Sequence, residues 1–190
     1  MHRSSLLLAA VIVSALPFSA IGEATKGVSA MTELVTKDIV VTRLYDAGPE
    51  TVWTALTTDA GVMGWWGPEG YDAPAAKMDV CEGGTSLVAM RGPDGVDIWM
   101  TWVYSKVVPH ERLEYVQNLS GPTGELLDPA VHNLPPEFPR DVVTVLTLTP
   151  KDGKTELRIV ENTTTSEFML QMSEMGLEQT LDKLGRSLAE

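Results

Sequence analysis

The chain has 190 residues, of which 44% are hydrophobic and five are Trp, a composition typical of one globular domain and not of a disordered chain. Asp and Glu number 26 against 14 Lys and Arg, so the formal net charge is −12. A surface this acidic, without runs of Lys or Arg, repels phosphate groups and makes nucleic acid and anionic membranes poor partners.

Cys81 is the single cysteine of the sequence, which excludes an intramolecular disulfide and a multi-cysteine metal site. A lone thiol in a stretch of strands is usually a small buried hydrophobic group, so we expect Cys81 to be buried. We expect no metal and no cofactor.

The first 24 residues have the three-part pattern of a secretory signal peptide: a short basic start, an apolar run at 6–18, and small residues after it. The run is too short for a comfortable membrane-spanning helix. A second interpretation stays open, in which Met31 begins a cytoplasmic protein and the residues before it reflect a mis-assigned start codon. Export to the periplasm or the medium follows from the first interpretation only. In both, 25–34 is a linker and 35–190 is the folded domain.

The folded part begins with a strand and two short helices. Residues 38–46 are rich in β-branched side chains in partial alternation, which predicts a strand. Pro49 suits the first position of a helix, which we extend to about residue 58. Asp59 is the expected N-cap of a second helix that ends at Trp66, before a Gly-Pro pair.

Strands separated by turn signals follow, and most neighbours are joined as hairpins across Gly-Gly or Asp-Gly pairs. One connection, 119–139, is long, holds five prolines and has no clear period. A loop of this length inside a compact domain is usually functional or mobile. The predicted strands are 76–82, 85–91, 96–107, 112–118, 141–149 and 155–162.

The C-terminal segment has the period of a long amphipathic helix. Thr164 and Glu167 match a capping box and predict its start. Gly176 lies inside the helix, where glycine costs about 1 kcal/mol relative to alanine, which suggests close approach of the sheet, a kink or room for a ligand. The predicted buried stripe consists of Leu170, Ser173, Leu177, Leu181, Leu184 and Leu188.

An antiparallel sheet with its helices gathered on one face is an α+β fold. Several motifs in this order of elements resemble one known family over about residues 32–188. They are Val41-Thr-Arg43, Tyr45-Asp-Ala47, Pro49-Glu-Thr-Val-Trp53, Trp65-Trp66-Gly67-Pro68, Asp79 with Glu82-Gly83-Gly84, Pro109-His-Glu-Arg-Leu113, Pro139-Arg140-Asp141 and Gly176-Leu-Glu-Gln-Thr-Leu181.

With these motifs the chain resembles the START-like (SRPBCC) helix-grip superfamily and, within it, proteins similar to the C-terminal domain of the activator of heat-shock-protein-90 ATPase. The resemblance implies a curved antiparallel β-sheet wrapped around a long C-terminal helix, with two short helices after the first strand. It also implies an apolar cavity between sheet and helix. The chaperone-activating role of the named protein uses a further N-terminal domain and is not transferred.

The cavity directs the functional prediction towards a small apolar or aromatic ligand. Aromatic and Met side chains suit a pocket that adapts to varied apolar molecules, although a single residue of this kind more often fills the core. The expected lining lies between the Trp102/Tyr104 strand face and the Met169/Met172 end of the helix. The candidate ligand-binding residues are Trp53, Trp66, Met90, Trp102, Tyr104, Phe168, Met169 and Met172.

An enzyme of the cyclase or hydrolase type is an alternative, although no paired catalytic motif is present and we assign no catalytic residue. Glu161, Asp97, His132 and Tyr104 are the polar residues that could serve it. A carboxylate in an apolar cavity has a raised pKa and can act as a base.

A protein-interaction module is the third alternative, acting through an edge formed by Trp65 and Trp66 together with the loop 119–139. Two adjacent Trp residues on one helix cannot both point inward. Trp65 is therefore the candidate for an exposed contact, such as one in a homodimer.

Overall fold

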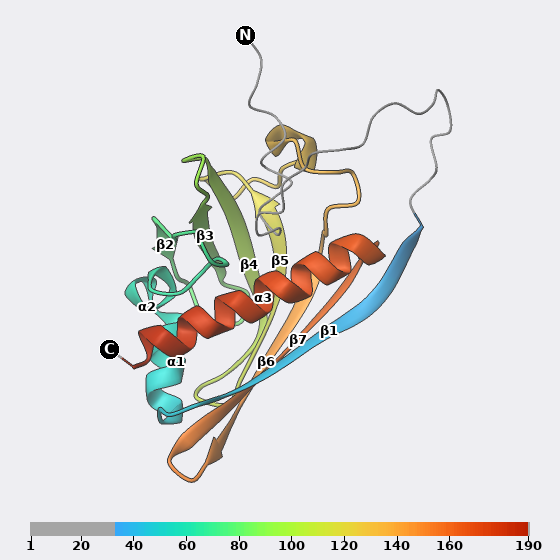
Figure 1. Cartoon of the computed structure of the whole chain (residues 1–190). Coiled ribbons are helices and arrows are strands. Elements are labelled where there is room, and N and C mark those ends of the chain that lie inside the picture. Colours follow the sequence, from blue (N-terminus) through green and yellow to red (C-terminus); the bar gives the residue numbers. More distant parts are fainter. Residues whose placement is uncertain (1–32, 190) are drawn as a thin grey trace, which may run out of the picture.

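The computed structural model describes residues 33–189, and the predicted signal peptide at 1–24 lies outside them. Seven antiparallel strands form one curved sheet in the order β1-β7-β6-β5-β4-β3-β2, and α3 lies along one face of it (Figure 1). The predicted α+β helix-grip fold is thereby confirmed. No helix among the described residues is long and apolar enough to span a membrane.

The elements occur in the predicted order, and their observed bounds differ from the predicted ones mainly at the ends. The strands are β1 (Leu34–Tyr45), β2 (Ala76–Lys77), β3 (Thr85–Arg91), β4 (Asp97–Val108), β5 (Arg112–Ser120), β6 (Val142–Lys151) and β7 (Lys154–Ser166). The helices are α1 (Pro49–Thr57), α2 (Asp59–Met63), the short 3-10 helix η2 (Pro129–His132) and α3 (Glu167–Ser187).

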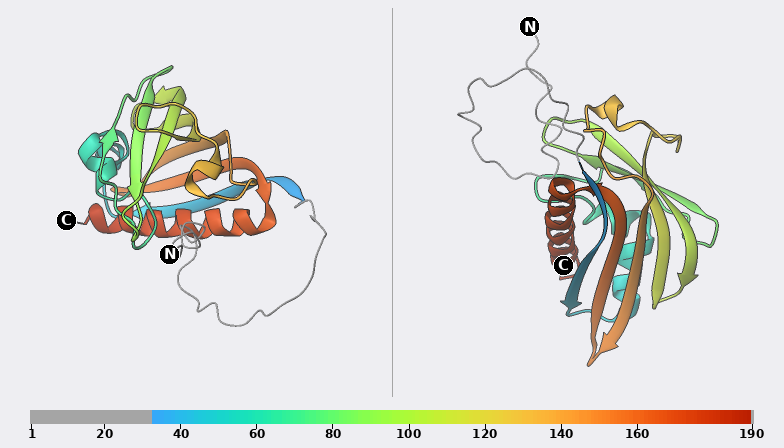
Figure 2. Two further views of the ribbon diagram at one scale, coloured as in Figure 1. Left: turned by 90° about the horizontal axis from the view of Figure 1, so that it is seen from above. Right: turned by 90° about the vertical axis from the view of Figure 1, so that its right-hand side faces the viewer.

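The N-terminal strand pairs with β7, the last strand, and not with its neighbours in the sequence. Ile39 lies opposite Glu161, and the register runs without interruption from Leu34–Ser166 to Tyr45–Thr155. Helices α1 and α2 connect this edge to β2 at the far edge of the sheet, and the two views of Figure 2 show α3 crossing the face between them.

The start of α2 differs from the prediction, in which Asp59 was the N-cap. Thr58 holds that position, because its side-chain oxygen accepts a hydrogen bond from the Gly61 N–H at 3.1 Å. Asp59 instead accepts a hydrogen bond from the Met78 N–H at 2.7 Å, which ties the helix to the chain beyond β2. The helix also ends at Met63, so that the tryptophans that follow are outside it.

The predicted start of α3 is likewise wrong by two residues. Ser166 is the N-cap and accepts a hydrogen bond from the Met169 N–H at 3.2 Å. Thr164 belongs to β7, where its hydroxyl is 2.7 Å from that of Thr36. Because β1 offers a partner strand up to Ser166, the ladder continues past the capping box that the sequence suggests.

Two further predictions fail locally. The strand expected at 76–82 is reduced to β2, because the chain after it bonds to side chains and to β4 instead, as in the Gly83 N–H to Tyr104 carbonyl bond of 2.8 Å. Cys81 falls in this irregular stretch and is exposed, contrary to expectation. The loop 119–139, expected to be functional or mobile, contains η2 and buries Leu134.

The most tightly packed part of the core lies under the C-terminal half of α3, and we call it the packed end. Its aliphatic side chains, 0–2% exposed, come from α1, α2, β7 and α3: Val52, Leu56, Val62, Leu157, Leu181 and Leu184. Tyr45 adds a hydrogen bond from its hydroxyl to the Leu181 carbonyl at 2.9 Å. The C-terminal half of α3 is thus fixed against the sheet by both apolar contact and a polar bond.

Candidate functional site

A partly open pocket of about 140 Å³ lies between the sheet and the N-terminal half of α3. Its walls are mostly apolar and come from the sheet, from α3, from the segment after α2 and from the end of the loop 119–139. The lining residues are Trp66, Gly67, Pro68, Met90, Met100, Gln117, Asn118, Leu119, Phe138, Pro139, Val142, Glu161, Thr163, Met172, Ser173, Gly176, Leu177 and Thr180.

The sheet contributes side chains from neighbouring strands that share a face. Gln117 pairs with Val142 of β6, and Thr144 of the same strand pairs with Glu161 of β7. Glu161 stands two residues before Thr163 on the same strand, so both side chains point to the helix side of the sheet. Period-two alternation therefore brings the Glu161 carboxyl, the Gln117 amide and the Thr163 hydroxyl into a mostly apolar wall.

The helix wall is built from positions three and four apart, which face the same way. Met172, Gly176 and Thr180 follow this spacing and all line the pocket. A Cβ atom added to Gly176 would meet no heavy atom within 4 Å outside its own helix turn. Gly176 thus borders open space. Of the three explanations that the sequence suggests for this glycine (close approach of the sheet, a kink or room for a ligand), room for a ligand fits these surroundings.

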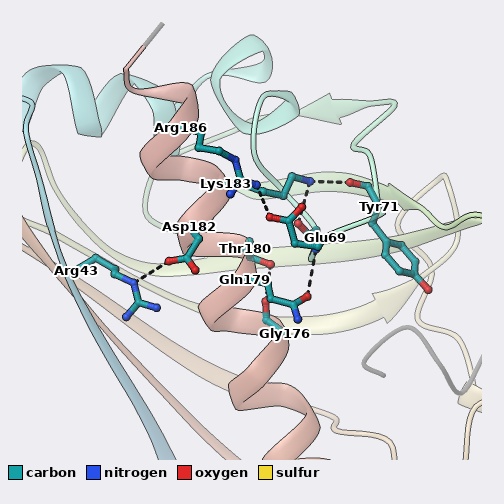
Figure 3. A network of polar contacts seen from close by, with 10 residues as sticks. Arg43, Glu69, Tyr71, Gly176, Gln179, Thr180, Asp182, Lys183 and Arg186 are labelled. Atoms are coloured by element: carbon teal, nitrogen blue, oxygen red, sulfur yellow. Dashed lines mark hydrogen bonds and ion pairs between the residues drawn. The ribbon is translucent and has the colours of Figure 1, made fainter. Parts of the chain in front are cut away.

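The third wall is a segment from Trp66 to Tyr71 that α3 holds in place (Figure 3). The Lys183 ammonium donates hydrogen bonds to the carbonyls of Gly67 at 3.0 Å and Tyr71 at 2.6 Å. Burial lowers the pKa of Lys183. Such charge-assisted bonds are among the stronger ones in proteins, so the segment is anchored.

One residue at the tip of that segment, Glu69, adds two further links to α3. The Glu69 N–H donates to the Gln179 side-chain oxygen at 3.3 Å, and its carboxylate pairs with Arg186 (Figure 3). Arg43 and Asp182 form another ion pair at 3.1 Å between β1 and the same helix. The pocket therefore has a border whose position depends on polar bonds to one helix.

Glu161 is the titratable group that lines the pocket. Burial raises its pKa to about 7, because removal from water disfavours the charged carboxylate. Within residues 33–189 it takes part in no ion pair, and the pocket lining contributes no Lys, Arg or His. Tyr115, on the same face of the sheet, has a pKa raised well above its usual value, first by burial and then by the charge of Glu161.

Gln117 presents a donor to the pocket. Its side-chain oxygen accepts a hydrogen bond from the Trp102 indole N–H at 2.8 Å, and this fixes the orientation of the amide. The NH₂ group is then free to donate. Two more polar atoms of lining residues, the Trp66 indole nitrogen and the Thr163 hydroxyl, are buried without a hydrogen-bond partner among the described residues.

The structure places three of the eight predicted ligand-binding residues at the pocket: Trp66, Met90 and Met172. The other five lie elsewhere. Trp102 is buried behind Trp66, with ring centroids 4.8 Å apart. Trp53 packs edge-on against His110.

The remaining three of those five are Tyr104, Met169 and Phe168. Tyr104 is buried beside Ser86, with its hydroxyl 3.1 Å from the Ser86 hydroxyl, and burial raises its pKa to about 12. Met169 is buried outside the pocket, and Phe168 is 60% exposed. Trp102 lies directly opposite Gln117, which in turn lies opposite Val142, and of these three only Gln117 and Val142 line the cavity.

Sequence reasoning missed most of the lining and named Glu161 only for the enzyme alternative. Gln117 and Leu119 alternate on β5, and Thr163 follows Glu161 on β7, so strand alternation could have placed them on one face. Phe138 and Pro139 come from the long loop, where no period exists to indicate a direction.

Among the other residues proposed for catalysis, none lines the pocket. Asp97 is engaged by the Arg91 guanidinium at 2.6 and 2.9 Å, which lowers the pKa of its carboxyl. His132 is at the end of η2. Glu161 alone satisfies the geometric condition for a base in the cavity.

The Trp65–Trp66 edge expected for a protein-interaction module is not present. Trp65 is 3% exposed, and its indole N–H donates to the Ala55 carbonyl at 2.9 Å. Because both residues follow the end of α2, helical geometry does not force them apart, and both turn inward with ring centroids 5.7 Å from each other. The assignment of Trp65 to an exposed contact is wrong.

Solved structures with the same fold come from several bacteria. A protein from Chromobacterium violaceum is 22% identical, with a TM-score of 0.66 over 80% of this chain and 97% of that one. A protein from Arthrobacter aurescens is 21% identical, with a TM-score of 0.67 over 80% of this chain and 86% of that one. An AHSA1-like protein from Aeromonas hydrophila is 17% identical, with a TM-score of 0.62 over 80% of this chain and 92% of that one. Identities this low show the fold alone.

A comparison with curated proteins gave no match. The family model described as "Activator of Hsp90 ATPase homolog 1-like protein" matches residues 46–189, which include every residue that lines the pocket. This span exceeds half of the sequence, and it agrees with the START-like helix-grip architecture of the structure. The chain therefore belongs to the activator of Hsp90 ATPase homolog 1-like family.

Proposed function

We propose that the protein binds a small hydrophobic or aromatic molecule in the pocket under α3. The observation that carries the proposal is the pocket itself, an apolar space that the chain keeps unfilled beside Gly176. A void in a core costs stability through lost contacts, so a protein that retains one at a helix glycine gives up stability that a larger side chain could supply.

The size and walls of the pocket support one compact occupant. A cavity of about 150 Å³ lined by apolar side chains is large enough for a benzene ring, and the volume here is about 140 Å³. Met90, Met100 and Met172 supply flexible, polarisable surface that adapts to varied shapes. The Gln117 NH₂ group and Glu161 would orient a polar atom of the ligand.

The experiment fills the pocket from the helix. Gly176→Leu places an aliphatic side chain in the open space, and Met175→Leu is the matched control on the exposed face next to it. With 2-phenylethanol as the probe, we expect chemical-shift changes at Met90, Gln117 and Met172 in the wild type and in the control, and their loss in Gly176→Leu. Equal responses in all three proteins would refute the pocket as the binding site.

Native mass spectrometry of protein purified from its source offers an independent measurement. We expect a bound lipophile that Gly176→Leu does not retain. A wild-type protein without adduct that also ignores the probe would overturn the proposal.

A second candidate function is an enzyme of the cyclase or hydrolase type, favoured by Glu161 with its pKa of about 7 inside the pocket. A carboxyl with this pKa is half ionised near neutral pH, which suits a general base. Hydrolysis of p-nitrophenyl butyrate tests the hydrolase form. Turnover that Glu161→Gln abolishes would support it, and turnover that is absent or unaffected by this substitution would count against it.

Export is a separate proposal, based on the signal-like pattern of residues 1–24. N-terminal sequencing of the mature protein tests it. A start just after Gly22 or Ala24 would support export, whereas a start at Met31 would support the cytoplasmic alternative.

A further inference from the structure

The carboxyl group of Glu161 has no ionic partner within the described chain. Its neighbours across the sheet are Ile39 on β1 and Thr144 on β6, and neither is charged. The helix residues that line the pocket are Met172, Ser173, Gly176, Leu177 and Thr180, and none of them is titratable. An unpaired carboxylate that is removed from water is costly, and a protein normally supplies a cation for it.

The side chain of Glu161 also remains reachable. It lines the pocket and keeps part of its accessible surface, in contrast to the fully buried Thr144 beside it. A molecule in the pocket can therefore touch the carboxyl without rearranging the sheet. Tyr115, the titratable neighbour on β5, stays neutral at ordinary pH because burial holds its pKa well above the usual value, so it offers no positive charge.

The aromatic part of the lining and the overall charge favour the same kind of ligand. Trp66 and Phe138 are aromatic residues of the lining, and the faces of aromatic rings attract cations as well as apolar groups. The net charge of −12 attracts cationic molecules to the protein and repels anionic ones. Fatty acids and other carboxylates are disfavoured both at long range and at Glu161.

Building on the proposed binding function, we infer that the ligand is a compact apolar amine whose protonated nitrogen pairs with the Glu161 carboxylate while its hydrocarbon part contacts Trp66, Phe138 and Met172. The pairing is a charge-assisted hydrogen bond in a site with little water, where such bonds are strong. No covalent step is involved. Below about pH 7, binding displaces the proton of Glu161 to solvent.

Three probes with one carbon skeleton test this inference: 2-phenylethylamine, 2-phenylethanol and phenylacetate, titrated into the wild type by calorimetry at pH 8. We expect the amine to bind at least 10-fold more tightly than the alcohol, and phenylacetate to bind most weakly. Glu161→Gln should bring the amine and the alcohol to within about 2-fold. Glu178→Gln, which removes the same charge from the exposed side of α3, should leave the preference of the wild type unchanged.

The pH dependence gives a second readout. An alkylamine stays protonated between pH 6 and 8 while Glu161 ionises, so the affinity of the wild type for the amine should rise up to about 10-fold over this range. The affinity for the alcohol should not rise, and the dependence should vanish in Glu161→Gln.

The outcomes separate the two proposals. If the alcohol binds as well as the amine, or if the preference persists in Glu161→Gln, the amine inference is overturned and the binding function stands. If no probe binds either the wild type or Gly176→Leu, both the binding function and the amine inference are overturned.

Discussion

The two halves of α3 cover very different environments on one sheet. At the packed end, Leu181 and Leu184 are fully buried against α1, α2 and β7. One to two turns earlier, Gly176 and Leu177 border a cavity. The same glycine-containing helix therefore serves as a structural anchor at one end and as a wall of a binding site at the other. The contrast indicates where stability is concentrated and where the chain tolerates empty space.

The contrast is tested most strongly by two leucines one turn apart. Leu181→Ala leaves a cavity in close-packed surroundings and should lower the free energy of unfolding by about 2–5 kcal/mol. Leu177→Ala only enlarges an existing pocket and should cost about 1 kcal/mol, because less contact is lost. Urea unfolding of both variants gives the difference. Equal losses would mean that the pocket end is as well packed as the other.

The next largest effect is expected at Glu161 and depends on pH. Its pKa is about 7 in the folded protein and near 4.5 when exposed, so the folded state holds a proton between these values that the unfolded state has lost. The carboxyl therefore opposes folding increasingly as pH rises from 4.5 to 7, up to about 3 kcal/mol. Glu161→Gln should be more stable than the wild type at pH 8 and similar to it near pH 4.

Denaturant titrations of the wild type and Glu161→Gln at the two pH values measure this difference. Glu156→Gln, on the same strand but paired with Lys151 near the surface, is the control and should shift stability by less than about 1 kcal/mol at either pH. A Glu161→Gln variant that is less stable at pH 8 would contradict the raised pKa.

Lys183 connects the two regions, since it extends from the helix turn of Leu184 to the pocket border. Lys183→Met removes the bonds to the Gly67 and Tyr71 carbonyls and should cost about 1–2 kcal/mol. Amide hydrogen exchange should accelerate between residues 67 and 71 and remain slow in the packed end. Uniform acceleration throughout the domain would show that these bonds have no local role.

The smallest expected effects come from the two glycines of α3. Gly176→Ala gains helix propensity without a steric contact and should stabilise the protein by about 0.5–1 kcal/mol. At Gly185, a Cβ atom would lie 3.3 Å from the Tyr45 ring, so Gly185→Ala should gain less or lose stability. Thermal unfolding compares the stability of the two variants. A larger gain in stability for Gly185→Ala than for Gly176→Ala would reverse the assignment of the open and packed ends of α3.

The sequence was sufficient for the fold because its elements carry strong local signals. Pro49 at a helix start, turn glycines between strands and the leucines of α3 each point to one structure. The prediction from sequence failed at Thr164, because this residue pairs with the distant strand β1. It also failed at 78–82, where the backbone bonds to a distant side chain, as in the hydrogen bond from the Met78 N–H to Asp59. Local capping patterns do not include those partners.

The pocket was predicted to lie under α3, and three of the eight residues named for it line the pocket that the structure contains there. Trp66, Met90 and Met172 were named because aromatic and Met side chains suit such sites, and they line it. Trp102 has the same chemistry and lies opposite the lining residue Gln117, but its ring packs against Trp66 and does not line the pocket. Residue type alone cannot distinguish a wall from the layer behind it, since that depends on curvature of the sheet.

The pairing of β1 with β7 has a consequence for the order in which the protein is made. The pocket takes Glu161 and Thr163 from β7 and one wall from α3, which follow all the other strands in the sequence, while β1 must wait for more than one hundred residues to find its partner. Contacts this distant in sequence form slowly. A nascent chain therefore exposes the apolar face of β3 to β6 until its final helix emerges, and the binding site is completed in the same step that protects the protein from aggregation.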